Sequence, residues 1–165
     1  MIEIALEDVA ATHRCAAALS AAAEPGMAIM LSGPLGAGKS ELARAFVRAW
    51  LGDPDAEVPS PTFTLVQPYE GPRGTVWHCD LYRLGDPGEV EELGLRDAFA
   101  DAVVLVEWPD RLGTDLPPDR LELALEICHG SDRRVARLTP HGRWADRMDA
   151  IDTGTPPGDR PQQRD

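Results

Sequence analysis

The feature that most constrains this chain is a glycine-rich segment, Gly33–Ser40, which has the sequence Gly-Pro-Leu-Gly-Ala-Gly-Lys-Ser and the pattern G-x-x-x-x-G-K-S/T. The short apolar run Met27–Leu31 precedes it, as expected of a buried parallel strand. Apolar residues at helical spacing follow it as far as Trp50. A loop between a strand and a helix binds phosphate because its backbone N–H groups turn inward and the helix N-terminus adds positive potential. The segment therefore predicts a nucleotide phosphate site.

Two side chains of this loop have specific expected roles. Lys39 is the single lysine among 16 basic residues, and all the others are arginine. In such a chain, a position that keeps lysine indicates a tight loop where a compact ammonium fits and a broad guanidinium does not. We expect Lys39 to neutralise the outer phosphates of ATP, and the Ser40 hydroxyl to ligate Mg²⁺. The residues expected to contact the nucleotide here are Gly33, Leu35, Gly36, Ala37, Gly38, Lys39, Ser40 and Glu41.

The rest of the chain alternates strands with helices. The predicted helices are Val9–Ala23, a helix from the loop to Gly52, and one or two short helices over Glu89–Ala100 broken near Gly94. The predicted strands are Met27–Leu31, Phe63–Val66, Val76–Cys79, Val103–Val106, Leu121–Ile127 and Val135–Leu138, with a turn-rich segment at Pro68–Gly74. This alternation predicts a three-layer α/β fold of the P-loop NTPase kind, with a mainly parallel sheet and a C-terminal antiparallel hairpin.

The composition favours one soluble domain and argues against several classes of protein. The chain has 165 residues, three cysteines and a net charge of −12. No window approaches the roughly 20 apolar residues of a membrane span, and the odd, unclustered cysteines fit a reducing cytoplasm. The charge opposes direct binding to nucleic acid or to an anionic membrane. After His141 the sequence is polar, so we expect a domain over residues 1–141 and a disordered tail over residues 142–165.

Carboxylates follow two of the predicted strands. Glu107 ends the apolar run Val103–Val106, and Asp80 ends Val76–Cys79. Ligands gather at the carboxyl ends of parallel strands, so both acids are expected near the phosphate loop. Either one could hold Mg²⁺ or orient an attacking water, and the sequence does not say which is the closer ligand. Thr62 lies where switch segments sense the terminal phosphate, but an extended linker explains it equally well.

Four ordered motifs resemble one family. They are the loop itself, Pro59-Ser60-Pro61-Thr62-Phe63-Thr64-Leu65-Val66, His78-Cys79-Asp80-Leu81-Tyr82-Arg83-Leu84, and the run from Val104 through Glu107-Trp108-Pro109. Over about Glu7 to Thr139 the chain looks like the bacterial TsaE (YjeE) family. Those proteins are small P-loop ATPases needed for the threonylcarbamoyl modification of the tRNA adenosine beside the anticodon. Two departures, Pro34 in place of an acid and Ser40 in place of threonine, leave nucleotide binding intact.

The resemblance implies roles for further residues and partners. It implies that Asp80 and Glu107 are active-site acids and that Trp108 lies near the nucleotide. It suggests that Thr12 and Arg134 also contact the nucleotide, although the residues alone describe only a polar helix position and a hairpin surface charge. The implied partner is a complex of the TsaD transferase with TsaB. Because a chain of charge −12 should not grip tRNA itself, this complex is expected to do so.

The expected function is therefore that of a Mg²⁺-dependent, ATP-binding weak ATPase serving tRNA threonylcarbamoylation. The enzymatic alternative is a small-molecule kinase, which shares the loop but for which no arginine-rich lid is visible. A further alternative is a binding module whose ATP state controls a partner. A GTPase is disfavoured, because its Asn-Lys-x-Asp element needs residues that this chain lacks. His78-Cys79 and Cys128-His129 hold zinc-ligand types, but strand core and turn explain them better.

Overall fold

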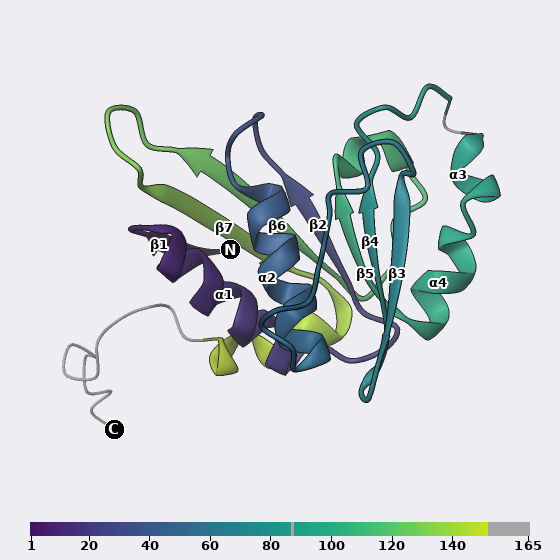
Figure 1. Cartoon of the computed structure of the whole chain (residues 1–165), viewed down its shortest axis with the longest axis horizontal. Helices are drawn as coiled ribbons and strands as arrows, with labels where there is room; N and C mark the ends of the chain where they lie inside the picture. Colours follow the sequence, from purple (N-terminus) through teal and green to yellow (C-terminus); the bar gives the residue numbers. More distant parts are fainter. Residues whose placement is uncertain (87, 152–165) are drawn as a thin grey trace.

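The centre of the fold is a seven-stranded sheet, seen in a computed structural model that describes residues 1–86 and 88–151 (Figure 1). The strands are β1 (Ile2–Leu6), β2 (Ala28–Ser32), β3 (Val66–Gly71), β4 (Gly74–Asp80), β5 (Val103–Glu107), β6 (Arg120–Ile127) and β7 (Arg134–Pro140). Their order across the sheet is β1-β7-β6-β2-β5-β4-β3. The central strands β6, β2, β5 and β4 are parallel, whereas β7 is antiparallel to β6 and β1, and β3 is antiparallel to β4. The mainly parallel sheet and the C-terminal hairpin are thus confirmed.

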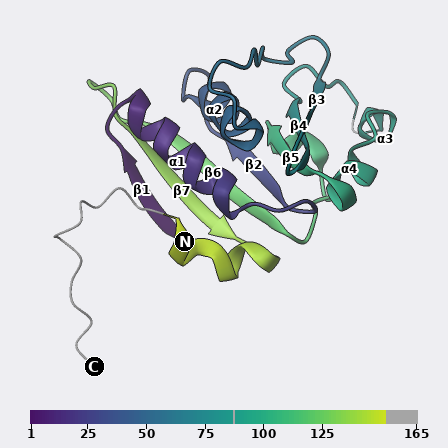
Figure 2. The same ribbon diagram turned by 60° about the horizontal axis from the view of Figure 1, so that its bottom comes forward.

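Helices lie on both faces of the sheet (Figure 2). The helical elements are α1 (Val9–Ala22), α2 (Lys39–Leu51), α3 (Glu89–Glu92), α4 (Leu95–Asp101) and the 3-10 segments η1 (Pro109–Leu112) and η2 (Gly142–Ala150). α1 and α2 pack side by side on one face, and α3 and α4 contribute to the apolar cluster on the other face. The three-layer arrangement is therefore confirmed. None of the helices within the described residues is both long and apolar enough to cross a membrane.

Burial explains the position of the phosphate-loop elements. The runs Ala28–Leu31 and Val103–Val106 are buried along their whole length, as expected of central parallel strands covered on both faces. α2 buries Leu42, Phe46 and Trp50, one stripe at helical spacing. β2 and α2 are therefore fixed by the core, and the loop between them is held at the carboxyl edge of the sheet.

The hairpin β3–β4 differs from the predicted one. A strand over Phe63–Val66 was expected, but β3 begins at Val66 and continues through Pro68 into the segment expected to be a turn. β3 is an edge strand, where a proline without an N–H is tolerated. Before it, the Leu65 N–H donates to the Pro61 carbonyl in a turn, and Phe63 is 83% exposed. The expectation of a strand at Phe63–Val66 is therefore wrong.

The first strand, β1, was not predicted. It lies at the edge of the sheet and pairs antiparallel with β7, Ile2 opposite Leu138 and Leu6 opposite Arg134. Ile4 and Leu6 are buried, whereas Glu3 and Ala5 are exposed. Alternation of buried and exposed residues is typical of a strand with one buried face. The sequence pattern that indicates β1 was therefore present, but it extends over only five residues.

The segment expected to begin a disordered tail is folded as far as Ile151. η2 places Trp144 and Met148 against the core, and the Trp144 side chain is 0% exposed. The Trp144 Nε1–H donates to the Ala28 carbonyl at 3.0 Å. The predicted tail was inferred from low overall hydrophobicity, and the prediction is wrong for this segment. Two apolar residues, Trp144 and Met148, are enough to pack it against the core. The remainder of the predicted tail, residues 152–165, lies outside the described residues.

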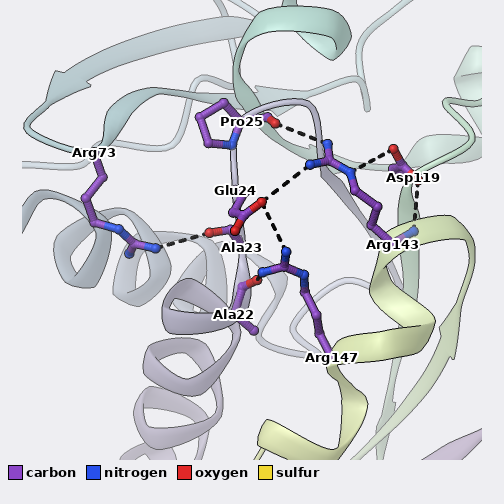
Figure 3. A network of polar contacts seen from close by, with 8 residues as sticks. All are labelled: Ala22, Ala23, Glu24, Pro25, Arg73, Asp119, Arg143 and Arg147. Atoms are coloured by element: carbon purple, nitrogen blue, oxygen red, sulfur yellow. Dashed lines mark hydrogen bonds and ion pairs between the residues drawn. The ribbon is translucent and has the colours of Figure 1, made fainter.

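Arginines from two distant segments meet at the carboxyl end of α1 (Figure 3). Arg73 comes from the β3–β4 turn, and Arg143 and Arg147 come from η2. The acceptors of their guanidinium N–H groups include the carbonyl oxygens of Ala22, Ala23 and Pro25. Terminal carbonyls of a helix have no partner within the helix, so cationic donors at this end satisfy them and complement the helix dipole.

Candidate functional site

The glycine-rich loop spans the gap between the end of β2 and the start of α2 (Figure 1). A Cβ at Gly33, whose φ is +141°, would lie 2.6 Å from the Leu125 carbonyl oxygen of β6. Only glycine therefore lets the loop pass this close to the neighbouring strand. Gly38 has a φ of +103° and precedes the first residue of α2. The first turn of α2 has N–H groups without helical partners, and these face the loop end of the helix.

Lys39 occupies the interior of the loop. Its side chain is buried, and its Nζ donates hydrogen bonds to the carbonyls of Gly33 at 2.6 Å and Pro34 at 3.0 Å. The ammonium also lies 4.3 Å from the ring centroid of Trp108. Burial lowers the pKa of Lys39, whereas the charges of Glu107 and Asp80 oppose that shift. The loop therefore holds an ammonium group whose partners are two neutral carbonyls and an aromatic face.

Ser40 and Glu107 are hydrogen-bonded across the site. The Ser40 Oγ–H donates to Glu107 Oε1 at 2.8 Å, which joins the start of α2 to the end of β5. The other oxygen, Oε2, lies 2.7 Å from Nε2 of His78. Glu107 is only 2% exposed. This pairing places an acid directly beside the hydroxyl expected to ligate Mg²⁺, whereas the sequence had left Glu107 and Asp80 equivalent.

Asp80 lies beside Glu107 on the neighbouring strand. The two residues are partners in the parallel register of β4 and β5. Asp80 Oδ1 accepts a hydrogen bond from the Tyr82 N–H at 3.1 Å. Burial raises the pKa of Asp80, the Tyr82 hydrogen bond opposes the rise, and the charge of Glu107 adds to it. Two carboxylates and the Lys39 ammonium therefore meet at one edge of the sheet, as the strand ends predicted.

These groups line a cleft of about 410 Å³. Its lining residues are Leu35, Gly36, Gly38, Lys39, Ser40, Glu41, Ser60, Thr62, Asp80, Tyr82, Arg83, Glu107 and Trp108. Thr62 is among these lining residues and therefore lies at the site. Its hydroxyl is 3.2 Å from that of Ser60. A larger hollow of about 550 Å³ is lined by residues that include Gly26 and Asp119, which precede β2 and β6, and it shares no lining residue with the cleft. Chemistry rather than size therefore identifies the smaller cleft as the candidate site.

The remaining candidate residues are placed less uniformly. Trp108 lines the cleft, and its backbone is in the left-handed region, with φ at +59°. Its backbone N–H donates to the Leu31 carbonyl. Arg134 is at the start of β7, and its guanidinium donates to the Gly36 carbonyl at 3.3 Å. Thr12 is buried in α1 and is not among the residues that line the cleft. Arg134 is therefore joined to the loop, and Thr12 is not.

Glu41 and Ala37 have local contacts around the loop. Glu41 accepts from the Arg44 guanidinium at 2.8 Å and lies 2.7 Å from His13 Nε2. The hydrogen bond to His13 and the charge of Arg44 lower the pKa of Glu41 against the effect of burial. Ala37 is buried, at 1% exposure, under the loop. Glu41 thus connects α2 to α1 at the mouth of the cleft, whereas Ala37 is not among the residues that line it.

The family of proteins to which the chain is related follows from its sequence. Residues 6–135 match the family described as threonylcarbamoyl adenosine biosynthesis protein TsaE. The chain belongs to the TsaE family. The matched range contains the phosphate loop, both acidic residues and Trp108, so it covers the site described above. The resemblance drawn from the four motifs is confirmed.

Individual TsaE relatives and a solved structure agree with this assignment. The tRNA threonylcarbamoyladenosine biosynthesis protein TsaE of Rickettsia bellii is 36% identical over 128 residues, which are 78% of this chain and 88% of the relative. The protein of the same name from Bacillus subtilis is 36% identical over 132 residues, 79% of this chain and 80% of the relative. The crystal structure of Bacillus subtilis YdiB has a TM-score of 0.74 and 27% identity, and covers 91% of this chain and 93% of YdiB.

Proposed function

We propose that the protein is a Mg²⁺-dependent, ATP-binding weak ATPase that supports threonylcarbamoylation of the tRNA adenosine next to the anticodon, through a partner transferase complex. The observation that carries this proposal is the meeting of three groups in one cleft: the Lys39 ammonium, the Ser40 hydroxyl bonded to Glu107, and the Asp80 carboxylate. Membership of the TsaE family and the names of its relatives support the modification pathway.

The phosphate loop would hold ATP mainly by charge and backbone donors. Lys39 exchanges its bonds with the Gly33 and Pro34 carbonyls for bonds to the outer phosphates, and the free N–H groups at the start of α2 bind the remaining oxygens. Arg134 adds a second cation at the outer side of the loop, next to Gly36. Leu35, a loop residue that is 67% exposed, offers an apolar contact at the cleft mouth.

The donor set fits Mg²⁺. The ion prefers oxygen ligands and is usually held by one or two carboxylates together with substrate phosphates. Ser40 and Glu107, with Asp80 on the next strand, supply such oxygens. Within residues 1–86 and 88–151, no group of three or more His, Cys, Asp or Glu side chains could hold a metal by itself. Water and nucleotide phosphates would supply the remaining ligands of the ion. Bound there, Mg²⁺ would neutralise charge that develops on the phosphates during hydrolysis.

Asp80 is the residue proposed to orient the attacking water. Glu107 has a partner on each of its oxygens, whereas the one hydrogen bond to the Asp80 carboxylate among the described residues comes from the Tyr82 N–H. The Asp80 carboxylate therefore has acceptor capacity left for a water in the cleft. The exposed Leu35 and Tyr82 at the rim leave the cleft open, which favours slow turnover because water is poorly excluded.

The partner is proposed to be the TsaD–TsaB complex, and the place of action the cytoplasm. A chain of net charge −12 is a poor ligand for tRNA, so the complex would hold the nucleic acid. Phe63 and Tyr82 are 83% and 42% exposed and flank the segments that carry Thr62 and Asp80. A partner on these side chains could sense the nucleotide, because the same segments line the cleft.

Titration of the TsaD–TsaB complex into the protein tests the proposal. The protein alone should hydrolyse ATP slowly, and the complex should bind it more tightly with ATP than with ADP or without nucleotide. Linkage then requires the complex to raise the affinity for ATP by the same factor. Equal affinity under all three conditions would reject nucleotide-gated binding and favour the small-molecule kinase that shares this loop.

A further inference from the structure

His78 is a buried side chain to which the proposed mechanism gives no role. It lies on β4, two residues before Asp80, and is 1% exposed. Its Nε2 lies 2.7 Å from Oε2 of Glu107. The sequence predicts His78 in a strand core, and the structure confirms this position. The ring is also hydrogen-bonded to the Glu107 carboxylate of the candidate metal site.

Each oxygen of the Glu107 carboxylate has a hydrogen-bond partner from a different element. Oε1 accepts from Ser40 at the start of α2, and Oε2 from His78 on β4. The last torsion of a glutamate side chain is broad, so a rotamer alone does not fix the plane of its carboxylate. Two hydrogen bonds do fix it. With Oε2 held by His78, Oε1 stays turned toward the hydroxyl expected to ligate Mg²⁺.

The imidazole at this position carries a cost that an apolar side chain would not have. A carboxylate at a metal site is ionised and only accepts hydrogen bonds, so the proton of the pair is on Nε2 of His78. The other ring nitrogen, Nδ1, is buried, and within the part of the chain that the structure describes it has no hydrogen-bond partner. A buried polar atom without a partner destabilises the fold. The Nε2–H bond to Glu107 therefore serves something other than packing.

We propose that His78 is a positioning residue for the metal site: its Nε2–H orients Glu107 so that Oε1 faces Ser40 and the place of Mg²⁺. The inference rests on the proposed Mg²⁺-dependent binding of ATP. Partners of metal-site residues typically change metal affinity by about 10–100-fold when they are removed. The effect of losing the His78 hydrogen bond should therefore appear in the contribution of Mg²⁺ to ATP binding, and not in the contacts between ATP and the loop.

Two amide variants of His78 form a matched pair. In His78→Gln the amide nitrogen reaches about as far as Nε2 and can still donate to Glu107, whereas in His78→Asn it ends near the position of Nδ1. Calorimetry gives the affinity for ATP in Mg²⁺ and in EDTA, and the ratio of the two measures the contribution of the metal. We expect the ratio to fall about tenfold or more in His78→Asn and to stay within about twofold of the unmodified protein in His78→Gln. The affinity in EDTA should be unchanged in both.

The inference and the proposed function fail in different ways. If the unmodified protein does not bind ATP, or Mg²⁺ does not strengthen binding, the proposed function fails and the inference falls with it. If the unmodified protein behaves as proposed, equal ratios in the two variants reject the positioning role. A loss of ATP affinity that is the same in Mg²⁺ and in EDTA also rejects it and leaves His78 a packing residue.

Circular dichroism and thermal unfolding establish that each variant is folded before its ratio is measured. Should His78→Asn not fold, His78→Ser takes its place, because it also lacks a donor at the position of Nε2. A ratio about tenfold lower in folded His78→Ser than in His78→Gln supports the proposal. A ratio reduced about tenfold in folded His78→Gln contradicts it, because that variant keeps the donor.

Discussion

Replacement of Trp144 by alanine tests whether η2 is an integral part of the fold. The Trp144 side chain is fully buried, and its N–H donates to the Ala28 carbonyl at the start of β2. Truncating a buried tryptophan to alanine costs about 3–5 kcal/mol, because its apolar contacts are lost and a cavity remains. We therefore expect the free energy of unfolding to fall by about 4 kcal/mol, a large part of the roughly 5–15 kcal/mol typical of a folded domain.

Urea denaturation and calorimetry measure this loss. For a chain of this size about 1 kcal/mol lowers the Tm by about 2–4 °C, so Trp144→Ala should lower it by about 8–16 °C. Trp144→Phe is the matched control, since it keeps an aromatic ring and removes the N–H donor; it should cost about 1–3 kcal/mol. ATP affinity at low temperature should be unchanged in both variants. If Trp144→Ala lowers the Tm by less than about 2 °C, the idea that η2 stabilises the fold is refuted.

The remaining predictions concern the cleft. Lys39→Ala and Lys39→Arg should each weaken ATP binding by about 100-fold or more in calorimetry, since two lost charge-assisted hydrogen bonds cost about 3 kcal/mol or more. Wild-type affinity in Lys39→Arg would contradict the argument from the single lysine. Asp80→Ala and Glu107→Ala should each lower kcat for ATP hydrolysis by about 10²-fold or more while ATP binding falls less than in the Lys39 variants; full hydrolysis by both would remove them from the site. Tryptophan emission should change on addition of Mg-ATP, and the change should vanish in Trp108→Phe but persist when any other tryptophan is replaced.

The parts of the site predicted from sequence are those with a local signal. The strand–loop–helix pattern placed Lys39 and Ser40, and acids directly after buried strands placed Asp80 and Glu107. These positions need only the rule that the carboxyl ends of parallel strands share an edge. Thr12 had no such local signal and came from the family resemblance alone, and the described structure does not bring it to the cleft.

The parts that could not be predicted depend on register and on distant packing. His78 meets Glu107, 29 residues further along the chain, because β4 and β5 pair in one particular parallel register. The pairing register of two strands that are far apart in the chain cannot be read from a short stretch of sequence. Trp144 is similar, since its hydrogen-bond acceptor Ala28 lies 116 residues earlier. Composition over the C-terminal residues therefore predicted a solvated segment where a few residues find partners elsewhere in the fold.

The order of strands in the sheet has a consequence for the synthesis of the protein on the ribosome. β2 pairs with β5 and β6, so Ala28–Ser32 emerges long before either neighbouring strand exists. β1 waits longer still, because it pairs with β7, whose residues begin at Arg134. Among the first four strands, β3 and β4 are the one adjacent pair. The nascent chain therefore carries the apolar strand β2 unpaired until β5 has been translated, and β1 can join the sheet only after β7.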